Sequence, residues 1–161
     1  YVRQASLPAI HHSRRGFFDA NTSLRVLFVF GYHGFEVYFG CDSAIGPMFG
    51  QTGHKYSRID LTLSGIGAYT PQELLRSVHA SSEEAVEMGK AIKSISLLRT
   101  IEWSQENTFE PAHRFIKAVL TVGYHKNTVL LPSVGEALAL NIVEKDQQLK
   151  QREPKCPTAN R

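Results

Sequence analysis

The sequence predicts a mixed α/β layer structure, and three kinds of pattern carry that prediction. Two almost continuous apolar runs, residues 24–30 and 35–41, flank the tetrapeptide Gly-Tyr-His-Gly, which is typical of a β-hairpin. Residues 59–63 alternate apolar and polar side chains, which indicates a third strand. Helix-start signals follow at residues 70–73 and 81–84, so the chain changes from strands to helices within one domain.

Both helix starts are marked by capping residues. Residues 70–73 read Thr-Pro-Gln-Glu, which places a Thr N-cap before Pro at the first helical position and Glu three residues after the cap. Residues 81–84 read Ser-Ser-Glu-Glu, a capping box that leads into a helix ending at about Lys93. Residues 95–101 then have the composition of another strand.

The two ends of the chain differ from its middle. Residues 1–23 are polar and predict irregular structure. A third helix is predicted before a Gly123 C-cap, because apolar side chains recur at helical spacing, at positions Phe115, Ile116, Val119 and Leu120. Residues 129–131 and 137–143 indicate short strands. We therefore expect one domain over residues 1–143 and a charged, disordered tail over residues 144–161.

Composition indicates a single globular domain in a reducing, cytoplasmic setting. Of 161 residues, 42% are hydrophobic and 20% charged, close to the average for globular proteins. The net charge is +3 and no basic stripe is interleaved with aromatic residues, so no nucleic-acid partner is expected. Cys41 and Cys156 form no CxxC motif. No apolar run suits a membrane helix, which leaves peripheral association as the membrane contact to expect. The first residue is Tyr1 rather than Met, which indicates a fragment or processed product.

Five residues at four places in the chain could carry chemistry, and each place has a simpler explanation. Asp42 follows a buried apolar strand, where a ligand carboxylate and a turn-forming Asp are both common. His11 and His12 offer nitrogen ligands for zinc, although neighbouring side chains point apart and at most one would bind; a solvated pair is the alternative. His79 can equally be an exposed loop histidine. Glu102 follows a strand and can be an ordinary edge carboxylate.

The order and surroundings of these positions resemble one family. Residues 8–15 and 19–24 are similar to its segments Pro-x-Gln-His-Trp-x-x-Arg and Asp-x-Asn-x-x-Leu, and residues 37–43 to its Phe-Ala-Gly-Asp-Thr. Residues 66–71 resemble Ile-Gly-Ala-Tyr-Glu-Pro, and residues 78–86 resemble His-x-x-Pro-Glu-Glu-Ala-Val. The family is the metallo-β-lactamase fold, in the branch that contains N-acyl-phosphatidylethanolamine-hydrolysing phospholipase D and related bacterial hydrolases.

The resemblance implies a fold and a set of roles. The chain would form the C-terminal half of an αββα sandwich, a mixed sheet with helices on one face. His11 would ligate one metal, Asp42 would bridge two metals, His79 would act on the substrate side, and Tyr69 would bind substrate from a loop at the mouth of the site. Two zinc ions would activate a bridging water to attack a lipid or a small ester or phosphodiester.

The departures from the family pattern are as informative as the matches. The family's His-x-His-x-Asp-His cluster is absent, and Glu102 stands where the family has a late histidine ligand. We therefore expect a truncated hydrolase that holds no zinc stably and is inactive alone. One alternative is a non-enzymatic interaction module that uses its orphaned apolar sheet face against itself or a complementary N-terminal half. Another is one piece of a complete enzyme whose missing ligands lie upstream.

Overall fold

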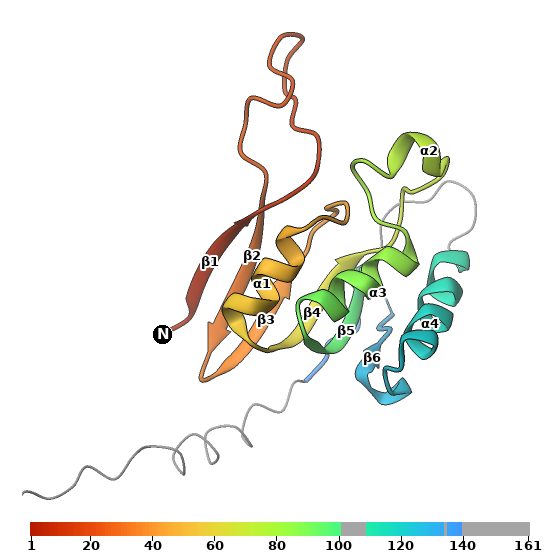
Figure 1. Ribbon diagram of the computed structural model, residues 1–161. Coiled ribbons are helices and arrows are strands. Elements are labelled where there is room, and N and C mark those ends of the chain that lie inside the picture. The colour runs from red at the N-terminus through yellow and green to blue at the C-terminus, as the bar shows by residue number, and fades with distance from the viewer. Residues whose placement is uncertain (101–108, 134, 140–161) are drawn as a thin grey trace, which may run out of the picture.

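One mixed sheet forms the centre of the molecule. The structure is a computed structural model that describes residues 1–100, 109–133 and 135–139. Within these residues six strands lie side by side in chain order, the first three antiparallel and the rest parallel to β3 (Figure 1). The strands are β1 Arg3–Pro8, β2 Val26–Tyr32, β3 Phe35–Phe39, β4 Ile59–Gly65, β5 Ser94–Thr100 and β6 Val129–Leu130.

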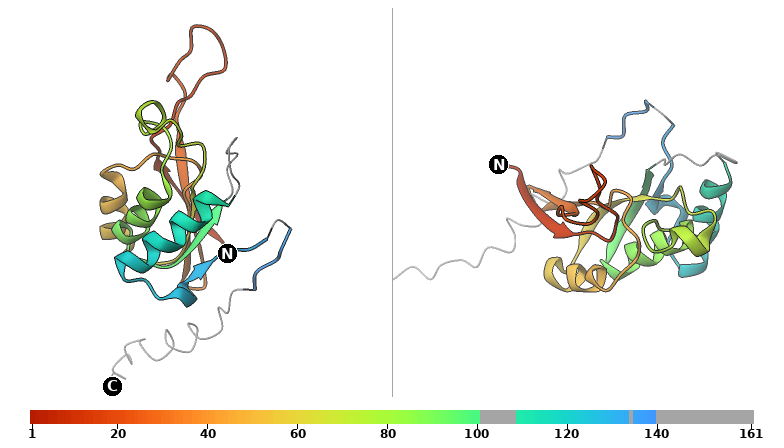
Figure 2. Two further views of the ribbon diagram at one scale, coloured as in Figure 1. Left: turned by 90° about the vertical axis from the view of Figure 1, so that its right-hand side faces the viewer. Right: turned by 90° about the horizontal axis from the view of Figure 1, so that it is seen from above.

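Helices cover one face of this sheet. Side chains of β2, β3 and β5 pack there against α1, α3 and α4 to form the core, and Figure 2 shows the three helices on the same side. The expected α/β arrangement with helices on one face is confirmed. No helix among the described residues is long and apolar enough to cross a bilayer. The helices are α1 Met48–Tyr56, α2 Gln72–Leu75, α3 Ser82–Ala91 and α4 Glu110–Val122, with a 3₁₀ turn at Lys126–Thr128.

Two of the three predicted helix-end signals are confirmed. The Ser81 hydroxyl accepts from the Glu84 backbone N–H, and the Glu84 carboxylate accepts from the Ser81 N–H, which completes the capping box of α3. Gly123 ends α4 with φ 88°, the left-handed conformation that favours glycine. The Thr70 cap is wrong: Pro71, in an extended conformation, occupies the cap position, and α2 is only four residues long.

The predictions for the first 23 residues and for residues 137–139 are wrong, because apolar spacing is a weak guide to structure there. Residues 1–23 are not wholly irregular, because β1 pairs with β2 over Arg3–Pro8 through backbone hydrogen bonds that any sequence can make. The strand predicted over residues 137–143 is absent at residues 137–139. Its remaining residues, the predicted tail over residues 144–161 and Glu102 lie outside the described residues. The sequence also did not predict α1. That helix contains Gly53, where a Cβ atom would meet the Ala91 carbonyl oxygen at 2.2 Å, so glycine permits its close approach to the end of α3.

The face of the sheet opposite the helices is apolar. Because side chains alternate along a strand, the residues between the core positions of β2 and β3 point to this face. Phe28 and Phe30 stack there with ring centroids 5.9 Å apart and lie opposite Phe39 and Val37 of β3. These side chains are only half-buried. Residues 131–133 and 135–139 lie on this side of the sheet (Figure 2), but most of them are themselves exposed.

We expect the isolated chain to self-associate or bind a hydrophobic dye through this face. Exposed apolar patches above a few hundred Å² are unusual on monomers. The double substitution Phe30→Ser, Phe39→Ser should abolish most of the dye signal and shift sedimentation to the monomer. Leu74→Ser, which removes an exposed apolar side chain from α2, should change neither readout. A compact wild-type monomer without dye binding would show that the face is covered.

Candidate metal centre

The site forms where several strands end at the same edge of the sheet. β1 and β3 run parallel to each other, with antiparallel β2 between them, and β4 and β5 run parallel to β3. The carboxyl ends of these strands therefore share one edge, the usual position of ligand sites in open α/β sheets. His11 follows the end of β1, and Asp42 follows the end of β3. His79 comes to the same edge from the segment between α2 and α3.

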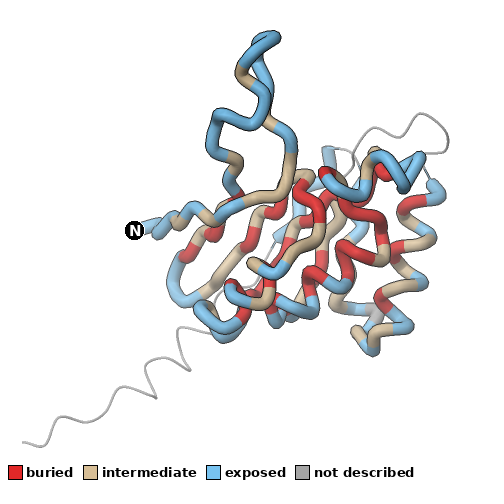
Figure 3. The backbone as a smooth tube through the Cα atoms, turned by 45° about the horizontal axis from the view of Figure 1, so that its top comes forward, coloured by how far each residue is buried: buried red, intermediate tan, exposed pale blue. Residues whose placement is uncertain are grey.

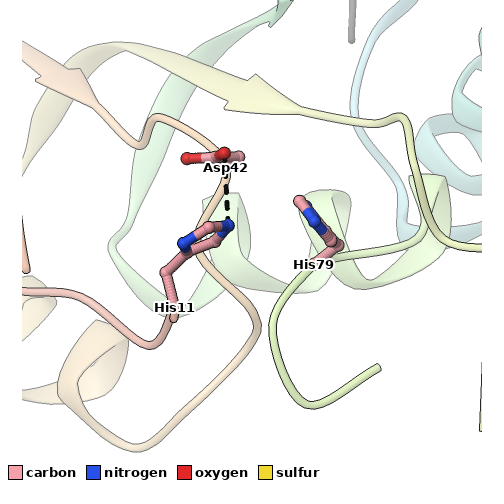
Figure 4. Close-up of side chains that lie close together, drawn as sticks. All are labelled: His11, Asp42 and His79. Carbon is pink, nitrogen blue, oxygen red and sulfur yellow. Dashed lines mark ion pairs between the residues drawn. The ribbon is translucent and has the colours of Figure 1, made fainter. Parts of the chain in front are cut away.

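Figure 4 shows His11, Asp42 and His79 together, which we call the His-Asp-His cluster. One ligand atom from each residue lies within 4.8 Å of the other two. His11 Nε2 and Asp42 Oδ2 are 3.3 Å apart. Zinc bonds of about 2.0–2.1 Å in a tetrahedral site place neighbouring ligand atoms about 3.4 Å apart, so this pair already has the required separation. The donor set, two imidazoles and a carboxylate, is also one that zinc accepts.

His11 is held in the tautomer that a metal ligand needs. Its Nδ1 lies 2.8 Å from the backbone carbonyl oxygen of His12, and because a carbonyl only accepts, Nδ1 carries the proton. Nε2 then presents a lone pair. Although Nε2 is close to Asp42, it makes no hydrogen bond of acceptable geometry and is buried. A buried lone pair facing a carboxylate is poorly satisfied without a cation, so the arrangement fits a bound metal ion.

Two hydrogen bonds between Ile10 and residues 43–44, which we call the clasp, bring His11 and Asp42 together. Ile10 precedes His11 in the chain, and Ser43 follows Asp42. The Ser43 hydroxyl accepts from the Ile10 backbone N–H at 3.0 Å, and the Ala44 N–H donates to the Ile10 carbonyl at 2.9 Å. Ser43 is only 3% exposed, so these bonds are shielded from water. This contact could not be predicted from the sequence, because residues 10 and 43 are distant in the chain and only the fold brings them together.

The turn that carries Asp42 is held against β4. Gly40 donates its N–H to the Leu63 carbonyl at 2.8 Å, and Gly65 donates to the Cys41 carbonyl at 3.0 Å. A Cβ atom at Gly40 would lie 2.9 Å from the Leu63 carbonyl oxygen, so this approach requires glycine. Cys41 itself has φ 47°. The carboxylate of Asp42 is consequently presented from a fixed backbone rather than from a free loop.

His79 faces His11 edge-on, with ring centroids 5.0 Å apart and planes at 81°. Burial is the largest cause that lowers the pKa of His79 below 6.5, and the neighbouring His11 lowers it further while Asp42 raises it. The His79 ring is thus neutral at pH 7 and able to donate a lone pair. The resemblance implied a substrate-side role for His79, which stays a prediction; the structure brings His79 near His11 and Asp42, among the candidate metal ligands.

Tyr69 lies in the loop after β4, where its side chain contacts residues of α4. Its hydroxyl hydrogen-bonds the Glu110 carboxylate, and the Arg114 guanidinium lies 4.8 Å from its ring centroid. Arg114 also makes two hydrogen bonds to Glu83, at 2.9 and 2.7 Å. Burial first, and then the bond to Glu110, raise the pKa of Tyr69 to about 12. The hydroxyl is therefore a fixed hydrogen-bond donor within this network, and a role in substrate binding stays a prediction.

Known proteins are similar to this chain in both sequence and fold. A family profile described as the beta-lactamase superfamily domain matches residues 2–100. Over 89 residues the chain is 33% identical to the N-acyl-phosphatidylethanolamine-hydrolyzing phospholipase D 1 of Caenorhabditis elegans. That match covers 55% of this chain and 25% of the relative.

Solved structures agree with the profile. Igni18, a metallo hydrolase from Ignicoccus hospitalis, superimposes with a TM-score of 0.60 at 20% identity over 84% of this chain and 51% of its own. The metallo-β-lactamase fold protein YhfI of Bacillus subtilis gives 0.58 at 18% identity, over 84% and 48%. The chain thus spans about half the length of these structures. Because the profile covers more than half of the chain and the fold agrees, the chain belongs to the beta-lactamase superfamily domain family, with the metallo-β-lactamase fold.

Proposed function

We propose that this chain carries part of the metal centre of a hydrolase that cleaves phosphodiesters or related esters, of the phospholipase D-like kind. The observation that supports the proposal is the His-Asp-His cluster, in which three metal-binding side chains converge from three separate segments. A metal ion held there would supply Lewis acidity and a water of lowered pKa. The substrate class is supported by the likeness to the nematode phospholipase D, which extends over 55% of this chain.

The three side chains act together in this proposal. His11 and Asp42 hold the metal, because their donor atoms already have the separation of neighbouring ligands. His79 completes the ligand set, and its lowered pKa suits that role because the ring stays neutral and offers a lone pair. A His79→Ala variant should therefore lose zinc affinity, whereas unchanged affinity would instead support the substrate-side role that the resemblance implied.

The site in this chain is open, which bears on how well it functions alone. The Asp42 side chain is 45% exposed and that of His11 29% exposed. Three donors are the number found with a catalytic zinc that keeps an open position, whereas a two-metal centre needs further ligands. We therefore propose that the isolated chain binds zinc loosely and turns over no substrate by itself.

A second candidate function is an interaction module derived from the same fold. The observation that favours it is the half-buried aromatic surface formed by Phe28, Phe30 and Phe39 on the face without helices. Its partner would be a second copy or a complementary N-terminal half that supplies another sheet at about 10 Å spacing. This function needs no metal, so it survives substitution of the cluster.

Zinc titration followed by calorimetry tests the cluster directly. His11→Ala and Asp42→Asn should each reduce zinc affinity by more than the ~10–100-fold that loss of an outer-shell partner costs. His12→Ala is the matched control: the residue type is the same and the position adjacent, but the side chain is exposed and outside the cluster. We expect wild-type and His12→Ala protein to bind one zinc and to lose it on dialysis against a mild chelator. Equal loss in the His11 and His12 variants would contradict the assignment of the ligands, and zinc that resists the chelator would contradict the proposal of loose binding.

Phosphodiester turnover by the zinc-loaded chain provides a separate test. We expect no release of nitrophenol from bis(nitrophenyl) phosphate above the metal-free background, because a single open ligand set lacks the second metal of the two-metal mechanism. Asp42→Asn should therefore leave the measured rate unchanged. A turnover that zinc restores and Asp42→Asn removes would show that the chain is an active enzyme alone.

A further inference from the structure

The loop between β1 and β2 extends away from the rest of the molecule. In Figure 1 it rises beyond the edge of the sheet that holds the His-Asp-His cluster, and Figure 3 shows it largely exposed. His11, at the base of the loop, belongs to the cluster. Its tip carries apolar residues where polar ones are usual, because Phe17 is 87% exposed and Phe18 101%; Leu24, shortly before β2, is 94% exposed. Three large apolar side chains this exposed on one loop require a partner to explain them.

Hydrogen bonds within the tip fix its backbone, so Phe17 and Phe18 project from an ordered turn. The Asp19 carboxylate accepts from the Gly16 N–H at 2.7 Å and the Arg15 N–H at 3.2 Å. Arg14 donates to the Gly16 and Phe17 carbonyls at 2.8 and 3.2 Å. These bonds close a compact turn, and its aromatic side chains are not among the described residues that pack in or against the core. A turn held in this way loses little conformational freedom when it meets a surface.

Charge identifies the kind of surface. Between residues 12 and 25 there are three arginines, Arg14, Arg15 and Arg25, and one carboxylate, Asp19, which gives a net charge of +2 with histidines neutral. Arg14 and Arg15 are exposed directly beside Phe17 and Phe18. Aromatic side chains that enter the interface, flanked by cations that meet headgroups, are the combination that binds an anionic bilayer. A protein groove would accommodate the aromatic side chains equally, but would not require adjacent cations.

We infer that residues 12–25 form a membrane-docking loop, in which Phe17 and Phe18 enter the interface of an anionic phospholipid bilayer while Arg14 and Arg15 contact its headgroups. Docking at the tip places the His-Asp-His cluster, at the base of the same loop, facing the lipid surface. The inference concerns the loop alone and needs no bound metal. It can therefore be tested on metal-free protein, so its failure and the failure of the proposed hydrolase function are separate results.

Cosedimentation of the metal-free full chain with vesicles tests the inference. Wild-type protein should bind vesicles of phosphatidylcholine mixed with phosphatidylserine, more weakly in high salt, and should bind phosphatidylcholine alone poorly. Phe17→Ser and Phe18→Ser should each weaken binding about tenfold or more, from the lost burial of one aromatic side chain. Arg14→Gln and Arg15→Gln should each weaken it about fivefold. Leu120→Ser, which removes an exposed apolar residue from α4, should leave binding unchanged.

A second readout separates insertion from simple adhesion. In a Phe18→Trp variant, lipids brominated on their acyl chains should quench tryptophan emission more strongly than in the wild-type chain, which has one native Trp. Circular dichroism checks that every variant keeps its fold. Wild-type binding that is equal for Phe17→Ser, Phe18→Ser and Leu120→Ser would overturn the inference, because another surface would then carry the lipid contact. Absence of binding to anionic vesicles would overturn it as well and would favour a protein partner for the loop.

Discussion

The arrangement of the site depends on the clasp between Ser43 and Ile10. Two chain segments leave the same edge of the sheet after β1 and β3, and nothing in strand pairing alone fixes where they go next. The buried Ser43 hydroxyl and the Ala44 N–H bind both backbone groups of Ile10, so the residues on either side, His11 and Asp42, must face each other. A buried polar contact of this kind is costly to break, because each freed group would be left without a partner.

The remaining features build on that constraint. Packing of α1, α3 and α4 on one face stiffens the strands, and the α3 capping box fixes the segment from which His79 reaches the cluster. Arg114, bonded to Glu83 and stacked over Tyr69, ties the loop after β4 to two helices. Two apolar surfaces stay accessible to solvent, the aromatic face of the sheet and the tip of the loop over residues 12–25. Both lie outside the core that packs the sheet against the helices.

Much of this could be predicted from the sequence, for identifiable reasons. The hairpin, β4, β5, α3 and the end of α4 follow from apolar periodicity and from capping residues that act over a few positions. β1 and α1 could not be predicted, since an edge strand depends on backbone bonding and α1 contains two glycines, of which Gly53 serves packing against the end of α3. His11 and Asp42 were predicted to be metal ligands through the resemblance to a family, and the structure places them side by side. The third cluster member was assigned a different role, because contact between residues 11, 42 and 79 is a property of the fold and not of spacing.

The central claim is that His11, Asp42 and His79 together bind one metal ion, and nitrogen NMR of the histidines tests it most directly. In protein labelled with ¹⁵N at histidine, zinc should shift Nε2 of His11 and one ring nitrogen of His79, while Nδ1 of His11 stays protonated on the His12 carbonyl. The ring of His12 should not respond. Zinc-dependent shifts at His12, or at His11 without His79, would contradict the account, because the cluster would then not be the ligand set.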